Sequence, residues 1–126
     1  MLKDHKILLG KAKEKEVYML LHQMNRHGLI AGASGTGKTV TLKVIAESLS
    51  DAGVPTFIAD VKGDLTGMIT PGNLSCIQER LDSMSISGFE TKSYPVRFFD
   101  VYKKNGLPMR AVMQEMDPVL LSRILD

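Results

Sequence analysis

The stretch from Gly32 to Thr39 constrains the fold of this chain more than any other feature. It reads Gly-Ala-Ser-Gly-Thr-Gly-Lys-Thr and matches the phosphate-binding loop pattern G-x-x-x-x-G-K-[ST] at every fixed position. Such a loop lies between a strand and a helix N-terminus, because curled backbone N–H groups and the helix dipole together hold a polyphosphate. Residues 28–31 before it are mostly apolar, and after it one helical face carries Leu42, Ile45, Ala46 and Leu49. The sequence therefore predicts strand, glycine loop and helix, which is an α/β nucleotide-binding arrangement.

Each position of this loop has an expected role. We expect the nucleotide to bind the backbone and side chains of Gly32, Ala33, Ser34, Gly35, Thr36, Gly37, Lys38, Thr39 and Val40. Lys38 is expected to reach the β- and γ-phosphates and to act in catalysis, while the Thr39 hydroxyl holds Mg²⁺. The expected cofactors are ATP and Mg²⁺.

Composition excludes several other classes of protein. The chain has 126 residues, enough for one domain, and its 16 basic and 14 acidic residues give a net charge of +2. That balance gives no support to nucleic-acid binding from bulk charge. Cys76 is the single cysteine, so no intrachain disulfide is possible and a reducing compartment is expected. Without an apolar run long enough to span a bilayer, we expect a cytoplasmic protein with no membrane partner.

The rest of the chain reads as alternating short strands and helices. Residues 6–10 and 17–21 predict a small N-terminal β-hairpin, although residues 17–24 also fit a helix. The helix after Thr39 is expected to stop near residues 51–53, with Gly53 just past its end. Residues 56–59 read as a parallel strand buried on both faces. Further elements are expected as follows: a helix capped by Ser75, a strand at 95–101 with a partner at 109–112, and a helix beginning at Asp117.

Asp60 is the second candidate site residue, and three interpretations remain open. It ends the apolar run 56–59, so it fits the Walker B carboxylate that organises Mg²⁺. It also fits a supporting position on a strand beside the true Walker B strand. The third interpretation is a structural cap for the turn through Lys62 and Gly63. Residues 60–63 match the D-x-x-G element of GTPases too, but only one helix and a tight turn fit between Lys38 and Asp60, so we discount a GTPase.

The order of elements indicates an incomplete domain. Strand-helix-strand-helix-strand is about half of a doubly wound sheet, and the helix expected from Asp117 has a capped start without a visible end. We therefore expect an N-terminal β segment over residues 1–24. Residues 25–126 are expected to be the N-terminal portion of a P-loop NTPase domain that stops before Walker B.

Beyond the loop itself, residues 25–42, 50–55, 59–65, 95–101 and 107–112 resemble bacterial HerA-like P-loop ATPases, the helicase HerA-like C-terminal domain family of the HerA/FtsK division. The resemblance implies a RecA-like core with a parallel sheet, a hexamer that hydrolyses ATP between subunits, and DNA as the translocated partner. It also implies that the Walker B Asp-Glu strand lies further downstream, which favours the supporting position for Asp60. No Walker B, sensor or trans-acting arginine can be assigned, so we expect this chain alone to hydrolyse ATP poorly.

The leading functional prediction is thus an ATP-hydrolysing, HerA-like motor or helicase subunit. Two other classes stay open. One is a nucleotide-dependent regulatory or interaction module that translocates nothing. The other is a P-loop small-molecule kinase, although no acceptor pocket or lid is evident in the sequence.

Overall fold

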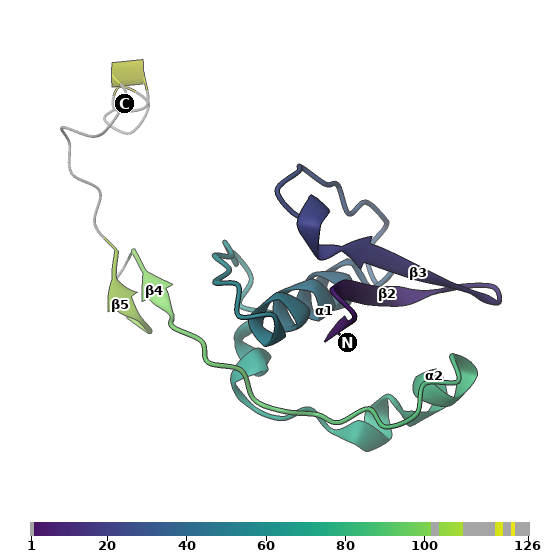
Figure 1. Cartoon of the computed structure of the whole chain (residues 1–126). Helices are drawn as coiled ribbons and strands as arrows, with labels where there is room; N and C mark the ends of the chain where they lie inside the picture. The colour runs from purple at the N-terminus through teal and green to yellow at the C-terminus, as the bar shows by residue number, and fades with distance from the viewer. Residues whose placement is uncertain (1, 102–103, 110–117, 120–121, 123–126) are drawn as a thin grey trace. The chain divides into compact units, whose positions relative to one another are not determined.

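The computed structural model describes residues 2–101, 104–109, 118–119 and 122. The chain forms two compact units, one of residues 1–94 and the other of residues 95–126. The first unit contains a three-stranded sheet and the two α-helices that Figure 1 labels, and the second contains a two-stranded sheet.

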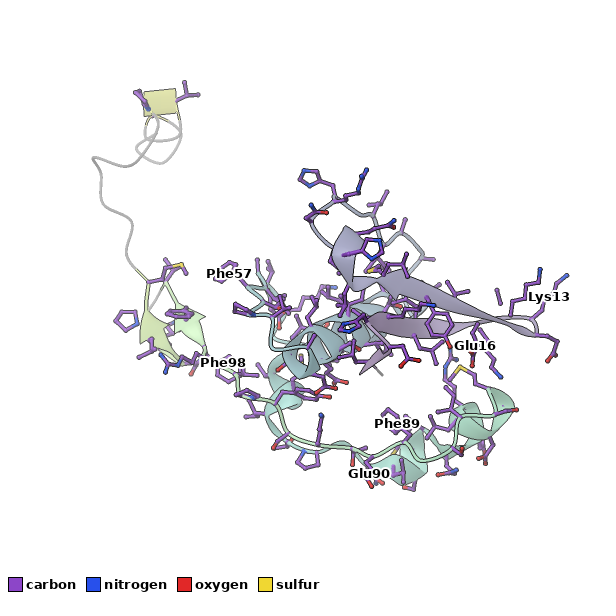
Figure 2. All side chains as sticks on the ribbon, viewed as in Figure 1. Lys13, Glu16, Phe57, Phe89, Glu90 and Phe98 are labelled. Carbon is purple, nitrogen blue, oxygen red and sulfur yellow. The ribbon has the colours of Figure 1, made fainter. Side chains whose placement is uncertain are left out.

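The predicted N-terminal hairpin is confirmed. Strands β2 (Lys6–Ala12) and β3 (Lys15–Leu20) pair antiparallel, and β1 (Leu2–Lys3) adds to the outer edge of β2, giving the order β1-β2-β3. The pairing runs further than the sequence indicated, because Ala12 lies opposite Lys15 and leaves a two-residue turn at the charged tip. Lys13 lies at this tip (Figure 2). A 3-10 turn, η1 (Leu21–Gln23), follows β3, so the helical alternative for residues 17–24 is wrong over β3.

The helix after the glycine loop is also confirmed. Helix α1 (Lys38–Asp51) ends where expected, with Gly53 in the left-handed conformation at φ 73°. The N–H of Gly53 donates to the Ser50 carbonyl at 3.0 Å, and the N–H of Val54 donates to the Leu49 carbonyl at 2.9 Å. These two bonds form a Schellman motif, which satisfies carbonyls that the helix itself leaves unpaired.

The small core of the first unit lies where the N-terminal sheet meets α1. Strands β1 and β2 both contact α1. Ile7 on β2 is fully buried, and Ala46 on α1 is 4% exposed. Ser48 is buried as well, and its hydroxyl donates to the Val44 carbonyl at 2.6 Å, so its polar group is satisfied within the helix. Strands β1 and β2 therefore pack against the helix that begins at the glycine loop.

Short helical turns follow α1. They are η2 (Thr66–Ile69), η3 (Leu74–Cys76) and α2 (Gln78–Ser83), with Met68 and Leu81 buried. The helix expected to be capped by Ser75 begins later, as α2, and its N-cap Ile77 makes no side-chain cap hydrogen bond. The preceding turn η3 is capped by Asn73, whose side-chain oxygen accepts from the Ser75 N–H at 3.0 Å and hydroxyl at 2.7 Å. Asn competes well for this role because its short side chain reaches the amide two residues on.

The two parallel strands expected at residues 28–31 and 56–59 are not formed in the structure. Neither segment has a ladder partner among the described residues, and the sheet of the first unit is purely antiparallel. Leu29 is 90% exposed and Phe57 is 75% exposed, with the Phe57 side chain directed outward in Figure 2. An apolar run favours a buried strand, but it becomes a strand only when a neighbouring backbone supplies hydrogen bonds. The described residues thus form a small α/β fold and show no complete RecA-like core.

Among the described residues, two parallel strands pair in the second unit. Strand β4 (Phe99–Asp100) pairs with β5 (Leu107–Pro108), so the strand expected at 95–101 is formed over two residues. Gly106 permits this close approach, since a β-carbon there would lie 2.8 Å from the Phe98 carbonyl oxygen. The partner expected at 109–112 and the helix expected from Asp117 fall largely outside the described residues.

Candidate functional site

The glycine loop is curled by its own residues. Gly35 and Gly37 adopt φ of 78° and 92°, values that side chains with a β-carbon rarely take. Across the curl, the Thr36 hydroxyl donates to the Ala33 carbonyl at 2.8 Å and the Thr36 N–H donates to the same oxygen at 3.4 Å. The pattern of glycines in the sequence therefore corresponds to a real backbone requirement.

Gly32 is required for a different reason, which the sequence pattern alone does not reveal. A β-carbon at Gly32 would lie 2.5 Å from the Thr36 hydroxyl oxygen, which is well inside contact distance. That oxygen is the donor of the bond to Ala33. The first glycine of the loop therefore leaves room for the hydroxyl that closes the curl.

Lys38 closes the loop from the other side. Its ammonium donates to the Gly32 carbonyl at 2.8 Å and to the Ala33 carbonyl at 2.7 Å. An ammonium has three donors, so these two bonds leave one for a further acceptor. The positive charge of Lys38 is therefore held at the mouth of the loop by two neutral oxygens, with no carboxylate in the described structure paired to it.

The start of α1 adds more donors at the same place. Gly37 is the N-cap and has no side chain to satisfy the first backbone N–H groups, and no acidic residue lies in the first turn. Thr41 N–H donates to the Gly37 carbonyl at 2.9 Å, so the intrahelical ladder begins only there. The preceding N–H groups of a helix have no intrahelical acceptor, and the helix dipole is positive at this end. Loop, ammonium and helix N-terminus thus bring positive potential together at one place.

Thr39 lies in the first turn of α1 and is partly buried. Its hydroxyl forms no hydrogen bond within the part of the chain that the structure describes, unlike the hydroxyls of Thr36 and Thr41. A hydroxyl oxygen without an internal partner remains available as a metal ligand.

Asp60 has a different environment. Its Oδ1 accepts from the backbone N–H of Lys62 at 3.2 Å and of Gly63 at 2.9 Å, and its Oδ2 accepts from Leu65 N–H at 2.8 Å. These backbone donors, with that of Leu65 foremost, hold the pKa of the carboxyl below its ordinary value. The structure therefore shows the turn cap that was one of the three interpretations.

The structure does not join the two candidate sites. All hydrogen bonds of Asp60 go to its own turn, and those of Lys38 go to the glycine loop. No hydrogen bond or ion pair connects them in the described residues. The catalytic roles predicted for Lys38 and Asp60 remain predictions.

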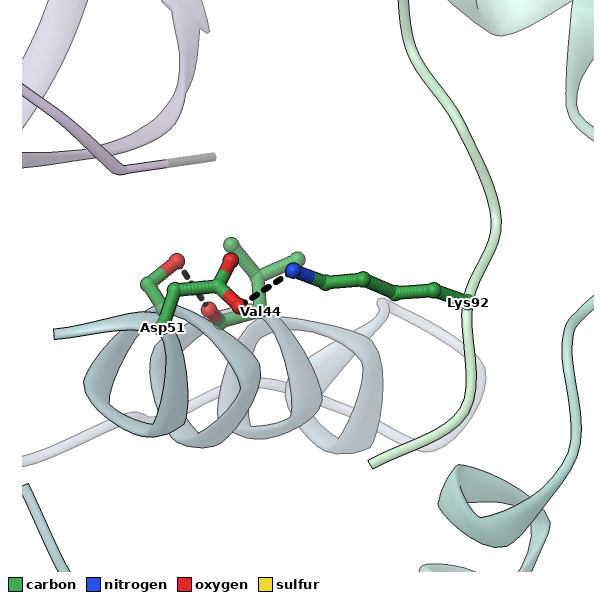
Figure 3. A network of polar contacts seen from close by, with 4 residues as sticks. Val44, Asp51 and Lys92 are labelled. Atoms are coloured by element: carbon green, nitrogen blue, oxygen red, sulfur yellow. Dashed lines mark hydrogen bonds and ion pairs between the residues drawn. The ribbon is translucent and has the colours of Figure 1, made fainter. Parts of the chain in front are cut away.

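A polar cluster near the C-terminal end of α1 has no signal in the sequence. Lys92 pairs with the Asp51 carboxylate at 2.5 Å, across 41 positions of sequence, as Figure 3 shows. The Lys92 ammonium also lies 5.2 Å from the centre of the Tyr94 ring. Burial raises the pKa of the nearby Glu47 carboxyl and of the Tyr94 phenol. The cluster ties the extended segment around residue 92 to α1, in the half of the helix away from the loop.

A shallow hollow of about 370 Å³ lies just before the loop in sequence. Its lining combines apolar side chains with three polar ones, namely Met19, Gln23, Met24, Arg26, His27, Leu29, Ile30 and Ile45 together with Gly28. No residue of the loop at 32–39 lines it. This hollow is therefore separate from the curled glycine loop.

These features define an α/β protein with a glycine loop and lysine at the start of a helix. More specifically, the chain belongs to the family described as helicase HerA-like C-terminal, whose model matches residues 5–126. The resemblance seen in the sequence is confirmed at the level of the family. The portion of a HerA-type domain that this chain represents, and the boundary expected at residue 24, stay predictions.

Neither the curated proteins nor the solved structures gave a match to this chain. Within the described residues, no helix combines the length and the apolar character needed to cross a membrane.

Proposed function

We propose that this chain is the ATP-binding part of a HerA-type motor ATPase. Membership of the helicase HerA-like family supports a motor ATPase in general terms. The observation that carries ATP binding is the loop at residues 32–39, where two left-handed glycines, the Lys38 ammonium and an uncapped helix start converge. In this proposal the phosphates bind Gly32, Ala33, Ser34, Gly35, Thr36, Gly37, Lys38, Thr39 and Val40.

The residues present fit a magnesium–triphosphate group. The uncapped N–H groups of α1 and the Lys38 ammonium supply positive potential for phosphate oxygens. The Thr39 hydroxyl supplies an oxygen of the kind that Mg²⁺ prefers. When bound, the metal ion neutralises charge that develops on the phosphates during transfer.

Lys38 would change partners on binding. In the free protein its ammonium bonds two neutral carbonyls, and in the complex it would bond anionic oxygens, which form stronger charge-assisted hydrogen bonds. The lysine is already at the loop, so little side-chain entropy is lost in this exchange. The free loop is therefore prepared for the ligand.

Calorimetry of the chain with ATP and Mg²⁺ tests the proposal. Replacing Lys38 with Ala should weaken ATP binding by about tenfold or more, because a hydrogen bond to a charged group contributes about 1.5–3 kcal/mol. Lys43→Ala is the matched control, since it removes the same charge from α1 outside the loop. Equal affinities of wild type and Lys38→Ala would contradict the proposal.

Hydrolysis, a hexamer and DNA translocation are further parts of this proposal, based on the family. ATP turnover by the protein with and without single- or double-stranded DNA tests them. Stimulation by DNA supports the motor. ATP binding without turnover or stimulation supports the alternative, a nucleotide-dependent regulatory module.

A further inference from the structure

The N-terminal hairpin holds the excess positive charge of this chain. Residues 3–16 contain five lysines and three acids, so they supply the net charge of +2, and basic and acidic residues balance over the rest of the sequence. The total charge is small, but its distribution is uneven. A local concentration of lysines on an exposed element is the electrostatic feature by which proteins bind nucleic-acid phosphates.

The structure gathers three lysines, named the hairpin lysines, at the end of the hairpin. Lys11 lies near the end of β2, Lys13 lies in the turn, and Lys15 begins β3. Residues 12–18 are all exposed, and Figure 2 shows Lys13 at the tip. Within the described residues, no carboxylate lies within ion-pair distance of the hairpin lysines. Their charges therefore remain available to a partner.

The two acids next to these lysines are accounted for in another way. Glu16 lies opposite Lys11 in the strand register, but its carboxylate accepts a hydrogen bond from the Tyr18 hydroxyl. Glu14 is exposed in the turn, and among the described residues it makes no ion pair. Neither acid is therefore bound to a hairpin lysine.

Lys13 has a backbone conformation that lysine rarely adopts. Its φ of 57° is left-handed, a region in which glycine is favoured because a β-carbon is strained there. A turn that only had to reverse the chain would be more stable with glycine at this position. A lysine in a strained conformation indicates a role for its side chain.

The shape of the hairpin fits duplex DNA. Strand β1 pairs with β2 only at Lys6 and Ile7, so the part of the sheet nearer the tip is a ribbon of two strands. The major groove of B-form DNA admits a two-stranded ribbon, whereas the major groove of duplex RNA is too narrow for side chains to enter. Lysines on both strands and in the turn can then reach phosphates along the groove.

We propose that the hairpin lysines bind the phosphate backbone of duplex DNA. The inference rests on the DNA part of the proposed function, and it assigns that contact to a part of the chain other than the nucleotide loop.

Anisotropy of a fluorescein-labelled DNA duplex, measured over a range of salt concentrations, tests this inference. The double variant Lys13→Gln, Lys15→Gln removes two charges from the hairpin, and the double variant Lys43→Gln, Lys62→Gln removes two charges elsewhere as the matched control. We expect the hairpin variant to bind about tenfold more weakly and to lose about 2 from the slope of log affinity against log salt. The control should match wild type. Equal losses in the two variants, or no loss in the hairpin variant, would overturn the proposal.

The variant Lys13→Gly separates the charge from the shape of the turn. It removes the ammonium and relieves the strained backbone together, so Tm should stay at or above the wild-type value while DNA binding weakens. The salt slope should fall by about 1. Weaker binding with a lower Tm, or with an unchanged slope, would show that the side-chain charge is not what binds DNA.

Further outcomes separate this inference from the proposed function. If wild type fails to bind ATP in calorimetry but the hairpin variant loses DNA binding as expected, the nucleotide part of the proposed function is refuted and the hairpin contact stands. DNA binding that does not depend on the hairpin lysines refutes the hairpin contact alone. Binding of wild type to vesicles of phosphatidylserine and phosphatidylcholine, without binding to DNA, refutes the hairpin contact together with the DNA part of the proposed function.

Discussion

Lys38 and Asp60 illustrate how the backbone uses charged side chains in opposite ways. The Lys38 ammonium binds carbonyl oxygens of a loop that precedes it, while the Asp60 carboxylate binds N–H groups of a turn that follows it. Each group forms hydrogen bonds with backbone atoms that have no partner in a helix or a sheet. Both side chains therefore shape the polypeptide before any ligand is considered.

Gly32 provides a test of the curl in the loop. Gly32→Ala should weaken ATP binding, because its β-carbon would displace the Thr36 hydroxyl from its bond to Ala33. Adding Thr36→Ala removes the clashing oxygen, so the double variant should bind ATP no more weakly than Thr36→Ala alone. Calorimetry on the four proteins of this cycle measures the coupling. Additive losses would show that the close approach does not matter.

Asp60 should give the turn a dependence on pH. Its folded pKa lies below the ordinary 3.8, so its hydrogen bonds stabilise the turn fully above that value and are lost as the pH falls through the folded pKa. The amide shifts of Gly63 and Leu65 should therefore titrate with a midpoint below 3.8. In Asp60→Asn this titration should disappear, and a midpoint at or above the ordinary value would refute the assignment.

Among the elements, α1 has the most complete set of local signals. Its N-cap, Gly37, has no side chain to cap the first backbone N–H groups, and such unpaired groups favour an external anion. At its other end, the Schellman motif satisfies the last carbonyls. Near that end, the ion pair of Asp51 with Lys92 attaches a distant segment. The two ends of the helix thus differ in how their backbone groups are paired, and it is the N-terminal end that leaves N–H donors for a ligand.

The C-terminal end of α1 can be tested with glycine substitutions. Gly53→Ala should lower the free energy of unfolding by about 1–2 kcal/mol, because a β-carbon is strained in the left-handed region. Gly67→Ala is the matched control, since Gly67 has no positive φ and nothing near its β-carbon position. Urea denaturation measures both variants. Equal stabilities would mean that the helix end relaxes without strain.

For the molecule as a whole, ligand binding and stability should be linked. The loop, α1 and the N-terminal sheet share one unit, with Ile7 and Ala46 in its core. At an ATP concentration of about 100 times the dissociation constant, binding should stabilise the folded state by about 2.7 kcal/mol and raise Tm by several degrees. Lys38→Ala should largely lose this shift in a thermal scan, while Lys43→Ala should keep it.

The sequence was sufficient for elements whose signals are local. Two short apolar runs around a charged stretch predicted the hairpin of β2 and β3, and the glycine at position 53 predicted the end of α1. Signals of this kind act within a few residues, so they do not depend on how the rest of the chain folds.

Features that depend on distant partners could not be predicted in this way. The runs at 28–31 and 56–59 have the composition of buried strands, but pairing depends on a neighbouring backbone that composition does not supply. Likewise, nothing in the sequence joins Lys92 to Asp51. Asp60 fitted three roles by pattern, because an acid after an apolar run suits a metal or a turn. The Asp100 carboxylate also accepts from backbone N–H groups, those of Lys104 and Asn105.

The bonds from Lys38 to Gly32 and Ala33 have a consequence for kinetics. A loop that needed its ligand in order to take shape would bind in two stages, with a slow ordering stage that saturates as the nucleotide becomes abundant. Here the Lys38 ammonium already bonds the loop, so the proposed binding would exchange carbonyl oxygens for phosphate oxygens at its nitrogen. For the proposed nucleotide binding we therefore expect an association rate set by how often a triphosphate collides with the loop.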